Sequence, residues 1–373
     1  MRIALLTYST KPRGGVVHTL NLAEALARHG ADVTVWSLAR GGDDGFFRRV
    51  DPAVTQQLIP FADVPDETVT ERIVRSIDTM RNAFDPTAHD IVHAQDCISA
   101  NAVGTCIRTI HHLDQFTTPI LVECHEKAVV NPYARICVSR AVAQEVRDGW
   151  GLSPTVIPNG VDHRRFHAAA APEAADDRRR WRDRLGPYVL AVGGIEPRKG
   201  SLDLLEAYAR LRRRNPDLAL VFAGGETLFD YRDYRAEFDR RQSELGVEPV
   251  VLGPVPDDTL PALVAGCDVF AFPSTKEGFG LAAMEALAAG RPVVARDLPI
   301  LREVFGNTVT YASDVDSLAA ELSAARTPDS RRREAGDALA RSLTWDNAAK
   351  AHLDFYAAHP GPIGGRGLDT VLA

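Results

Sequence analysis

Two glutamates eight residues apart, Glu277 and Glu285, have the residue type and spacing best suited to chemistry in this chain. An apolar strand stops at Pro273, and a glycine-rich turn then leads into a helix that we expect from Phe279 to Gly290. The N-terminus of that helix presents free amides and partial positive charge, which suits an anion. Both carboxylates are expected to be ionised at neutral pH and able to accept paired hydrogen bonds from a diol. A sugar linked to a nucleoside diphosphate offers both kinds of group.

This segment, together with the Gly-Arg-Pro-Val-Val that follows it, resembles the glutamate-x7-glutamate signature of retaining glycosyltransferases with the GT-B fold, most closely family 4. The resemblance implies that Glu277 meets hydroxyls of the donor sugar and that Glu285 holds the ribose diol. It also implies that the backbone between them approaches the sugar and the diphosphate. The residues of that backbone are Gly278, Phe279, Gly280 and Leu281.

Two adjacent cations, Arg198 and Lys199, follow another strand end. The family has Arg and Lys at this site to hold the diphosphate, with Arg directly after the first glycine; here that position is Gly194. Lys199 matches the family's lysine, and we expect Arg198 to supply the guanidinium from a different backbone position. These side chains would stabilise the departing diphosphate, so no metal or other cofactor is required. Residues 314–316 spell the D-x-D of metal-dependent glycosyltransferases, but they precede a helix and are interpreted as a helix cap.

The first half of the chain offers further candidates. Gly14 and Gly15 lie between the first strand and the first helix, where a phosphate can approach backbone amides; the family resemblance places Gly15 at the diphosphate. His111 matches a family histidine near the donor sugar and the reacting centre, and His112 stands where Asp is frequent, although a strand-end histidine can also be structural. Asp96 is expected either to hold an acceptor hydroxyl or to cap the next helix.

The nucleotide base is expected beside a loop of the second half that contains Gly253 and Val255. Such a loop contacts a base largely through its backbone, so the base cannot be identified from side chains.

Composition limits the class of protein. A length of 373 residues fits two domains, and a net charge of −7 argues against a nucleic-acid binder. Five cysteines without a C-x-x-C pair indicate reduced thiols in a cytoplasmic protein. The chain shows neither a signal peptide nor an apolar stretch long enough to span a membrane, and peripheral contact with a membrane is left open. The helix expected over 67–84 mixes both charge signs, which favours a soluble acceptor over a lipid.

Strand and helix patterns alternate in both halves of the chain, which predicts an α/β fold with mostly parallel sheets. The resemblance implies the GT-B fold: two Rossmann-like domains that face each other across a cleft, with a C-terminal helix that crosses back to the N-terminal domain. The expected parts are residues 1–165 (acceptor domain), 166–186 (linker), 187–343 (donor domain), 344–358 (crossover helix) and 359–373 (disordered tail).

The expected function is metal-independent transfer of a hexosyl group, with retention, from a UDP- or GDP-linked sugar to an acceptor hydroxyl. Retention is implied by the resemblance, and no residue stands out as a covalent nucleophile. A nucleotide-sugar epimerase, hydrolase or phosphorolytic enzyme on the same scaffold is one alternative, and it would act without an acceptor hydroxyl. A non-catalytic sugar-nucleotide sensor is another, and it would bind the donor without transfer. A nicotinamide dehydrogenase is disfavoured because the G-x-G-x-x-G fingerprint is missing.

Overall fold

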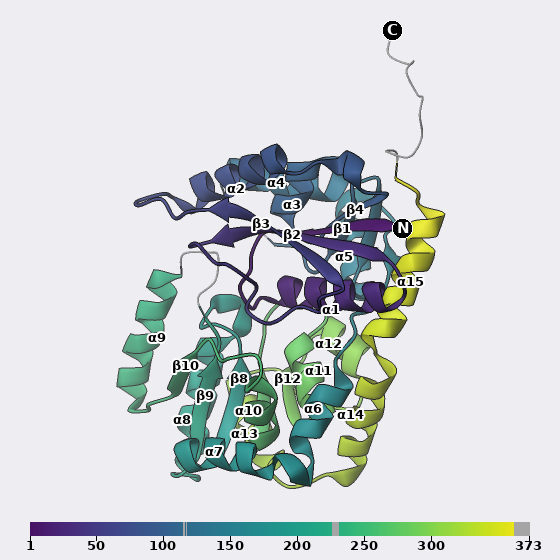
Figure 1. Cartoon of the computed structure of the whole chain (residues 1–373). Helices are drawn as coiled ribbons and strands as arrows, with labels where there is room; N and C mark the ends of the chain where they lie inside the picture. Colours follow the sequence, from purple (N-terminus) through teal and green to yellow (C-terminus); the bar gives the residue numbers. More distant parts are fainter. Residues whose placement is uncertain (115, 117, 226–230, 362–373) are drawn as a thin grey trace. The chain divides into compact units, whose positions relative to one another are not determined.

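The computed structural model describes residues 1–361 except 115, 117 and 226–230 (Figure 1). The chain divides into two compact units. The first comprises Met1–Gly160 and Trp345–Ala373, and the second comprises Val161–Thr344. Residues 166–186, which we predicted as a linker, contain the end of one helix, a 3-10 turn and the helix α7 (Ala175–Leu185). From residue 362 onward the predicted tail lies outside the described residues.

The described part of the first unit contains a seven-stranded parallel sheet in the order β3-β2-β1-β4-β5-β6-β7. Its strands are β1 (Arg2–Thr7), β2 (Asp32–Arg40), β3 (Val54–Phe61), β4 (Ile91–Ala94), β5 (Ile107–Ile110), β6 (Ala134–Cys137) and β7 (Thr155–Val156). Its helices are α1 (Gly14–Arg28), α2 (Val69–Ala83), η1 (Pro86–Ala88), α3 (Cys97–Val103), α4 (Pro119–Val130), α5 (Arg140–Trp150) and α15 (Trp345–Ala358).

The C-terminal helix α15 packs against α1, as the crossover prediction requires (Figure 1). Arg28 of α1 and Asp346 of α15 form an ion pair of 2.8 Å. Deeper in the unit, the hydroxyl of Tyr356 lies 2.7 Å from Nδ1 of His93 on β4. The helix therefore completes the core of the first unit although it follows the second unit in sequence.

The described part of the second unit contains a six-stranded parallel sheet in the order β10-β9-β8-β11-β12-β13. Its strands are β8 (Tyr188–Val192), β9 (Ala219–Ala223), β10 (Val250–Gly253), β11 (Val269–Phe272), β12 (Val293–Arg296) and β13 (Thr310–Ala312). Its remaining helices are α6 (His163–Ala170), η2 (Pro172–Ala174), η3 (Pro197–Lys199), α8 (Ser201–Arg212), α9 (Arg232–Leu245), α10 (Leu260–Gly266), α11 (Leu281–Ala288), α12 (Pro299–Phe305), α13 (Val315–Ala324) and α14 (Ser330–Ser342).

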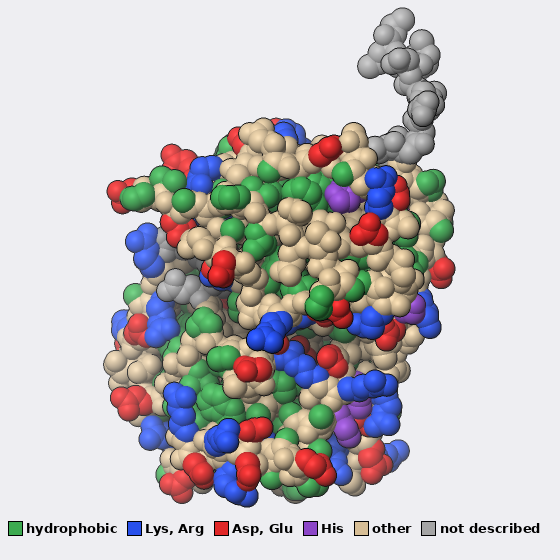
Figure 2. Space-filling model, in the orientation of Figure 1, with side chains coloured by type: hydrophobic (Ala, Val, Ile, Leu, Met, Phe, Trp, Pro, Cys, Tyr) green, Lys and Arg blue, Asp and Glu red, His purple; other side chains and the backbone are tan. Residues whose placement is uncertain are grey.

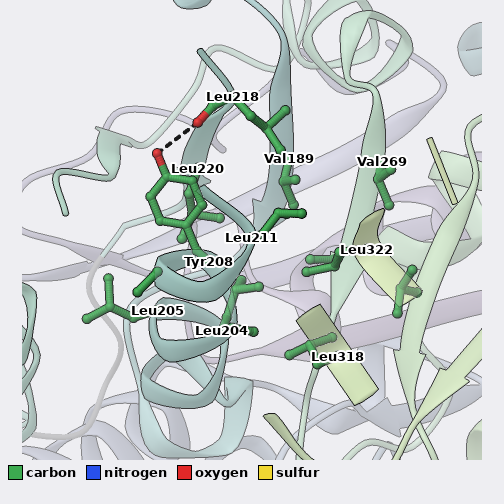
Figure 3. Packing of buried hydrophobic residues seen from close by; sticks show 14 of the residues in the cluster. Val189, Leu204, Leu205, Tyr208, Leu211, Leu218, Leu220, Val269, Leu318 and Leu322 are labelled. Carbon is green, nitrogen blue, oxygen red and sulfur yellow. Dashed lines mark hydrogen bonds between the residues drawn. The ribbon is translucent and has the colours of Figure 1, made fainter. Parts of the chain in front are cut away.

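Helices α8 and α13 share an apolar core with this sheet (Figure 3). Leu204 of α8 and Leu318 of α13 are each 1% exposed, as is Val189 of β8. Tyr208 is also buried, and its hydroxyl donates to the carbonyl of Leu218 at 2.9 Å, so its polar atom has a partner. Strands that are covered on both faces have continuous apolar sequences. This is why the alternation of strands and helices along the chain could be recognised.

In each sheet the order in which successive strands are added reverses at one point. This point lies between β1 and β4 in the first unit and between β8 and β11 in the second. In open parallel sheets, ligands bind beyond the carboxyl ends of the strands at such a point. The candidate residues of the second unit lie at or after the ends of β8, β10 and β11, and those of the first unit follow β1, β4 and β5. The topology therefore gathers each set at one edge of its own sheet.

Figure 2 shows Lys and Arg side chains interspersed with Asp and Glu on the drawn face. Such mixing is typical of a solvated surface and differs from a basic stripe that follows phosphates. Among the residues that the structure describes, no helix is both long and apolar enough to cross a bilayer.

Candidate active site

In the second unit, the turn that carries the two cations packs directly on the end of β11. Gly200 has a φ of 64°, and a Cβ atom on it would lie 2.3 Å from the carbonyl oxygen of Pro273. The amide of Thr275 donates to the carbonyl of Arg198 at 2.8 Å. Glycine at position 200 is therefore required for the close approach that brings Arg198 and Lys199 to the glutamate signature.

Glu277 lies between these two cations. Its Oε1 atom is 2.6 Å from Nζ of Lys199 and 3.2 Å from Nη1 of Arg198, and its side chain is only 10% exposed. Burial raises the pKa of Glu277, but Lys199 and Arg198 more than offset this effect and lower it to about 2. The side chain is therefore a carboxylate at neutral pH, as predicted.

Arg198 also contacts two groups that the sequence did not single out. Its Nη1 donates to the carbonyl of Lys276 at 3.3 Å, and its Nη2 lies 3.7 Å from Oε1 of the buried Glu196. The guanidinium thus reaches the signature although Gly194 occupies the position where the family carries Arg. Glu196 stands two residues before Arg198 in a turn, and no sequence spacing distinguishes it from a surface glutamate.

Helix α11 starts at Leu281, two residues later than predicted, because Gly280 adopts a φ of 98°. A Cβ atom at this position would lie 3.0 Å from the ring of Phe305 and 3.2 Å from that of Phe272. Phe279 is buried at the same turn. The predicted backbone of residues 278–281 therefore forms a tightly packed turn at the N-terminus of the helix, where amides are available to an anion.

Glu285 lies inside α11, and its protonation differs from the prediction. Burial raises the pKa of Glu285 to about 8, against the opposing charge of Arg165, and the carboxylates of Asp257 and Asp162 contribute to the increase. The prediction that both signature glutamates are ionised at neutral pH is therefore wrong for Glu285 in the free protein. Sequence spacing cannot show this, because Arg165 and Asp257 belong to distant segments.

The loop that contains Gly253 and Val255 is followed by a residue that affects the pKa of Glu285. Gly253 ends β10 with a φ of 69°. Four residues later, Asp257 forms an ion pair of 2.8 Å with Arg165, the cation whose charge acts on Glu285. The loop predicted beside the base thus lies in the electrostatic neighbourhood of the glutamate predicted to hold the ribose.

In the first unit, Gly14 and Gly15 form the first residues of α1 instead of a separate loop. A Cβ atom on Gly15 would lie 3.7 Å from Cδ2 of His111, so the helix N-terminus and the strand-end histidine are adjacent. Burial, together with the neighbouring His18 and Arg108, holds the pKa of His111 well below its ordinary value, so the imidazole is neutral. Its Nε2 atom is buried without a hydrogen-bond partner among the described residues.

A cluster of buried imidazoles surrounds His111, and the sequence analysis did not find it. His18 lies edge-on to His111 with ring centroids 4.7 Å apart, and its Nδ1 is 2.9 Å from Oδ1 of Asn159. Burial lowers the pKa of His18 to about 3 and that of His352 to about 4, so both are neutral. These residues come from α1, α15 and a loop far apart in sequence, and a single histidine in a helix carries no recognisable signal.

His112 and Asp96 occupy different surroundings. Nε2 of His112 lies 3.4 Å from Oδ1 of Asp114. Asp96 caps α3: its Oδ1 accepts from the amide of Ser99 at 2.8 Å, and its Oδ2 accepts from the amide of Tyr8 at 2.9 Å. The capping alternative for Asp96 is thus confirmed, and a role toward an acceptor stays a prediction.

The D-x-D sequence has the role predicted for it. Asp314 forms a capping box with Ser317 at the start of α13. Its Oδ1 accepts from the amide of Ser317 at 2.8 Å. The carboxylate thus stabilises the helix N-terminus, and the cap interpretation is confirmed.

Comparison with known proteins gives consistent matches along the chain. The family model described as Glycosyltransferase Family 4 matches residues 12–165, and the one described as Glycosyl transferases group 1 matches residues 176–338. A D-inositol 3-phosphate glycosyltransferase of Corynebacterium aurimucosum is 29% identical, and the match covers 96% of each chain.

Solved structures share the fold. Sucrose-phosphate synthase from Thermosynechococcus elongatus superposes with a TM-score of 0.77 at 20% identity, over 96% of this chain and 98% of that one. HepE of Anabaena, solved in complex with UDP and glucose, gives a TM-score of 0.72 at 20% identity, over 96% and 100% of the two chains. The chain therefore belongs to family 4 (group 1) of the glycosyltransferases, has the two parallel α/β sheets of the GT-B fold, and is an enzyme that transfers a sugar from a nucleotide-sugar donor.

Proposed function

We propose that this enzyme moves a hexosyl group, with retention and without a metal ion, from a UDP- or GDP-linked donor to an acceptor hydroxyl. The observation that carries the proposal is the ionised Glu277, held by Lys199 and Arg198 beside the N-terminus of α11. This arrangement supplies a carboxylate for sugar hydroxyls, and next to it cations and backbone amides for a diphosphate.

In the proposed reaction, the bond between the anomeric carbon and the diphosphate oxygen breaks while the acceptor oxygen attacks the same face. The acceptor proton passes to an oxygen of the leaving diphosphate, so no protein nucleophile is needed. Lys199 has three N–H donors, of which one is directed at Glu277, and Arg198 adds a planar guanidinium. Their charge stabilises the diphosphate as it leaves, in the role that a metal ion has in other transferases.

The other end of the donor is assigned to Glu285 and the loop with Gly253 and Val255. Two ribose hydroxyls can donate to one carboxylate, and Glu285 lies on the same helix as the diphosphate-binding turn. Asp257 joins this region through its ion pair with Arg165. The base would then contact mainly the loop backbone.

From the first unit we assign Gly15 and His111 to the donor. A buried imidazole nitrogen without a partner is costly unless a ligand satisfies it, and Nε2 of His111 is such an atom within the described residues. Because the imidazole is neutral, it can accept or donate a hydrogen bond to a sugar hydroxyl without adding charge near the anomeric carbon.

The donor and acceptor classes rest on similar proteins. HepE binds UDP and glucose, which supports a uridine donor with a hexose. The relative named for D-inositol 3-phosphate supports a small soluble acceptor, to which we assign His112 and Asp96 as candidate contacts.

Glu277→Gln tests the assignment. Donors are first selected by thermal shift from UDP-, GDP-, ADP- and dTDP-sugars, and acceptors by transfer assays. We expect kcat to fall by roughly 10²–10³, comparable to the loss of one transition-state hydrogen bond in other enzymes. Lys276→Gln, which removes a charge from the same turn, is the control and should retain activity. Circular dichroism of both variants checks that each is folded.

Several outcomes would contradict the proposal. Near-normal turnover by Glu277→Gln would remove the assigned role. An inverted anomeric centre, read by proton NMR of the product, would exclude retention. Sugar released from the donor at the same rate without an acceptor would favour a hydrolase or epimerase.

A further inference from the structure

A cluster of three potential metal ligands lies in the second unit, on residues that the donor site does not use. His163 and His167 are on α6, and Asp337 is on α14. Nε2 of His163 is 2.7 Å from Oδ1 of Asp337, and Nδ1 of His167 is 3.5 Å from the same oxygen. The three ligand atoms lie within 4.8 Å of one another. They therefore converge on one point between the two helices.

The spacing within α6 explains this convergence. Residues four apart lie on one face of a helix, and the two imidazoles are stacked at 20° with centroids 5.0 Å apart. His163 alone would satisfy one oxygen of Asp337 by a hydrogen bond. His167 is too far from that oxygen for a strong bond, yet its ring nitrogen is directed at the same place. A simple ion pair with Asp337 needs only one imidazole. A metal site needs a second imidazole beside the carboxylate, and His167 is in that position.

The distances match tetrahedral coordination. With Zn–N and Zn–O distances of about 2.0–2.2 Å, ligand atoms in a tetrahedral site lie roughly 3.3–3.5 Å apart. The observed 3.5 Å lies at the upper end of this range, and the observed 2.7 Å is about 0.6 Å short of its lower end, so a side-chain rotation that lengthens the His163–Asp337 distance by about that amount would admit an ion. Two imidazoles and one carboxylate suit Zn²⁺ and also Co²⁺ or Ni²⁺, with water in the remaining position.

A further side chain holds the carboxylate of Asp337 in place. Arg341 binds the other carboxylate oxygen, Oδ2, at 2.6 Å. It therefore leaves Oδ1 to the two histidines and orients the carboxylate, as hydrogen-bonded partners of metal ligands commonly do. His167 is 57% exposed at its side chain, which gives an ion a path from solvent.

We propose that His163, His167 and Asp337 form a binding site for a divalent transition metal, with Zn²⁺ as the best match. The helices that it would join are the first and last of the second unit, and both pack against α11. Gly336, next to Asp337, packs so closely on α11 that a Cβ atom would lie 2.9 Å from the side chain of Leu287. An ion between α6 and α14 would thus join the two helices that pack against α11.

The test uses the full chain without a histidine tag. Co²⁺ is titrated into the protein, and the visible absorption that is typical of tetrahedral cobalt is recorded; Zn²⁺ is then added as a competitor. We expect one equivalent to bind, with displacement by Zn²⁺. His167→Ala removes an exposed ligand and should weaken binding by at least the ~10–100-fold that loss of an outer-shell partner costs. His29→Ala, at a surface histidine of the first unit, should bind as wild type.

Thermal unfolding gives a second readout. Because a ligand of the folded state stabilises it, excess Zn²⁺ should raise the melting temperature of the wild type and of His29→Ala, but not that of His167→Ala. The proposal is overturned if the wild type shows no tetrahedral cobalt spectrum. It is also overturned if His167→Ala keeps wild-type affinity, because the metal would then be bound by the cysteines or by other surface groups.

Discussion

Replacing Glu285 by glutamine should make the protein more stable, and the gain should be larger at pH 7 than at pH 5. In the folded protein, burial raises the pKa of this carboxyl to about 8, from an ordinary value of 4.5. The folded state therefore prefers the protonated form, whereas the unfolded chain releases the proton above pH 4.5. Stability linked to Glu285 is fully present below that pH and is lost as the pH rises toward 8. Glutamine keeps the shape and cannot ionise.

The size of the effect follows from the two pKa values. The cost of keeping Glu285 protonated is about 1 kcal/mol at pH 5 and about 3 kcal/mol at pH 7. For a unit of this size, 1 kcal/mol corresponds to a change in melting temperature of roughly 2–4 °C. We therefore expect Glu285→Gln to raise the melting temperature by about 2–4 °C at pH 5 and by about 6–12 °C at pH 7. Calorimetry and urea unfolding, both without donor, measure these changes.

Glu277→Gln is the matched control, because the chemical change is identical and the expected sign is opposite. The cations beside Glu277 lower its pKa to about 2, so its carboxylate contributes stability above pH 4.5 that is lost as the pH falls toward 2. The variant should lose roughly 3 kcal/mol at both pH 5 and pH 7. The reasoning fails if Glu285→Gln is destabilised equally at both pH values, since Glu285 would then form a charged structural contact.

Two further predictions concern the same unit. The affinity for the donor should rise by at least about tenfold between pH 6 and pH 8, because Glu285 ionises and can then accept the ribose hydroxyls. The charge of a sugar-linked nucleoside diphosphate is constant over this pH range. Calorimetric titrations measure this rise. Asp257→Asn should move it to lower pH, because Asp257 raises the pKa of Glu285. An affinity of the wild type that does not change with pH would refute the assignment of Glu285 to the ribose. Gly200→Ala should cost more than about 3 kcal/mol in urea unfolding, because its Cβ would meet the Pro273 carbonyl. Gly246→Ala shares the left-handed backbone but meets nothing within 4 Å, so a cost of only about 1–2 kcal/mol is expected, and equal losses would show that the contact is unimportant.

The fold was predictable where strands are buried on both faces. Strands β1 and β8 are continuous apolar runs followed by amphipathic helices, so the alternation was visible in the sequence. Strand β3 was missed because it is the edge strand of its sheet and contains Gln56, Gln57 and Pro60, which an edge tolerates. Short elements such as α12, with seven residues, and β13, with three, span too few residues for a hydrophobic period to repeat several times.

The site was predictable where its residues are close in sequence. Glu277 and the cations at 198 and 199 were identified from two local segments, and Gly200 explains why these segments meet. The environment of Glu285 was not predictable, because Arg165 and Asp257 reach it from other elements. His18 was not predicted for the same reason: only the fold brings it next to His111 at the end of β5.

The different charge states of the two signature glutamates suit the order of events during donor binding. A nucleoside-diphosphate sugar arrives with two negative charges, and a site with two ionised glutamates would repel it. Glu277 is already balanced by its cations, and Glu285 is uncharged at neutral pH, so in the proposed binding mode the diphosphate does not meet two unbalanced carboxylates. Once the ribose hydroxyls are in place they can donate to Glu285, which favours its ionised form. The proton released at that step should appear as a buffer-dependent heat of binding at pH 7, and Glu285→Gln should abolish it.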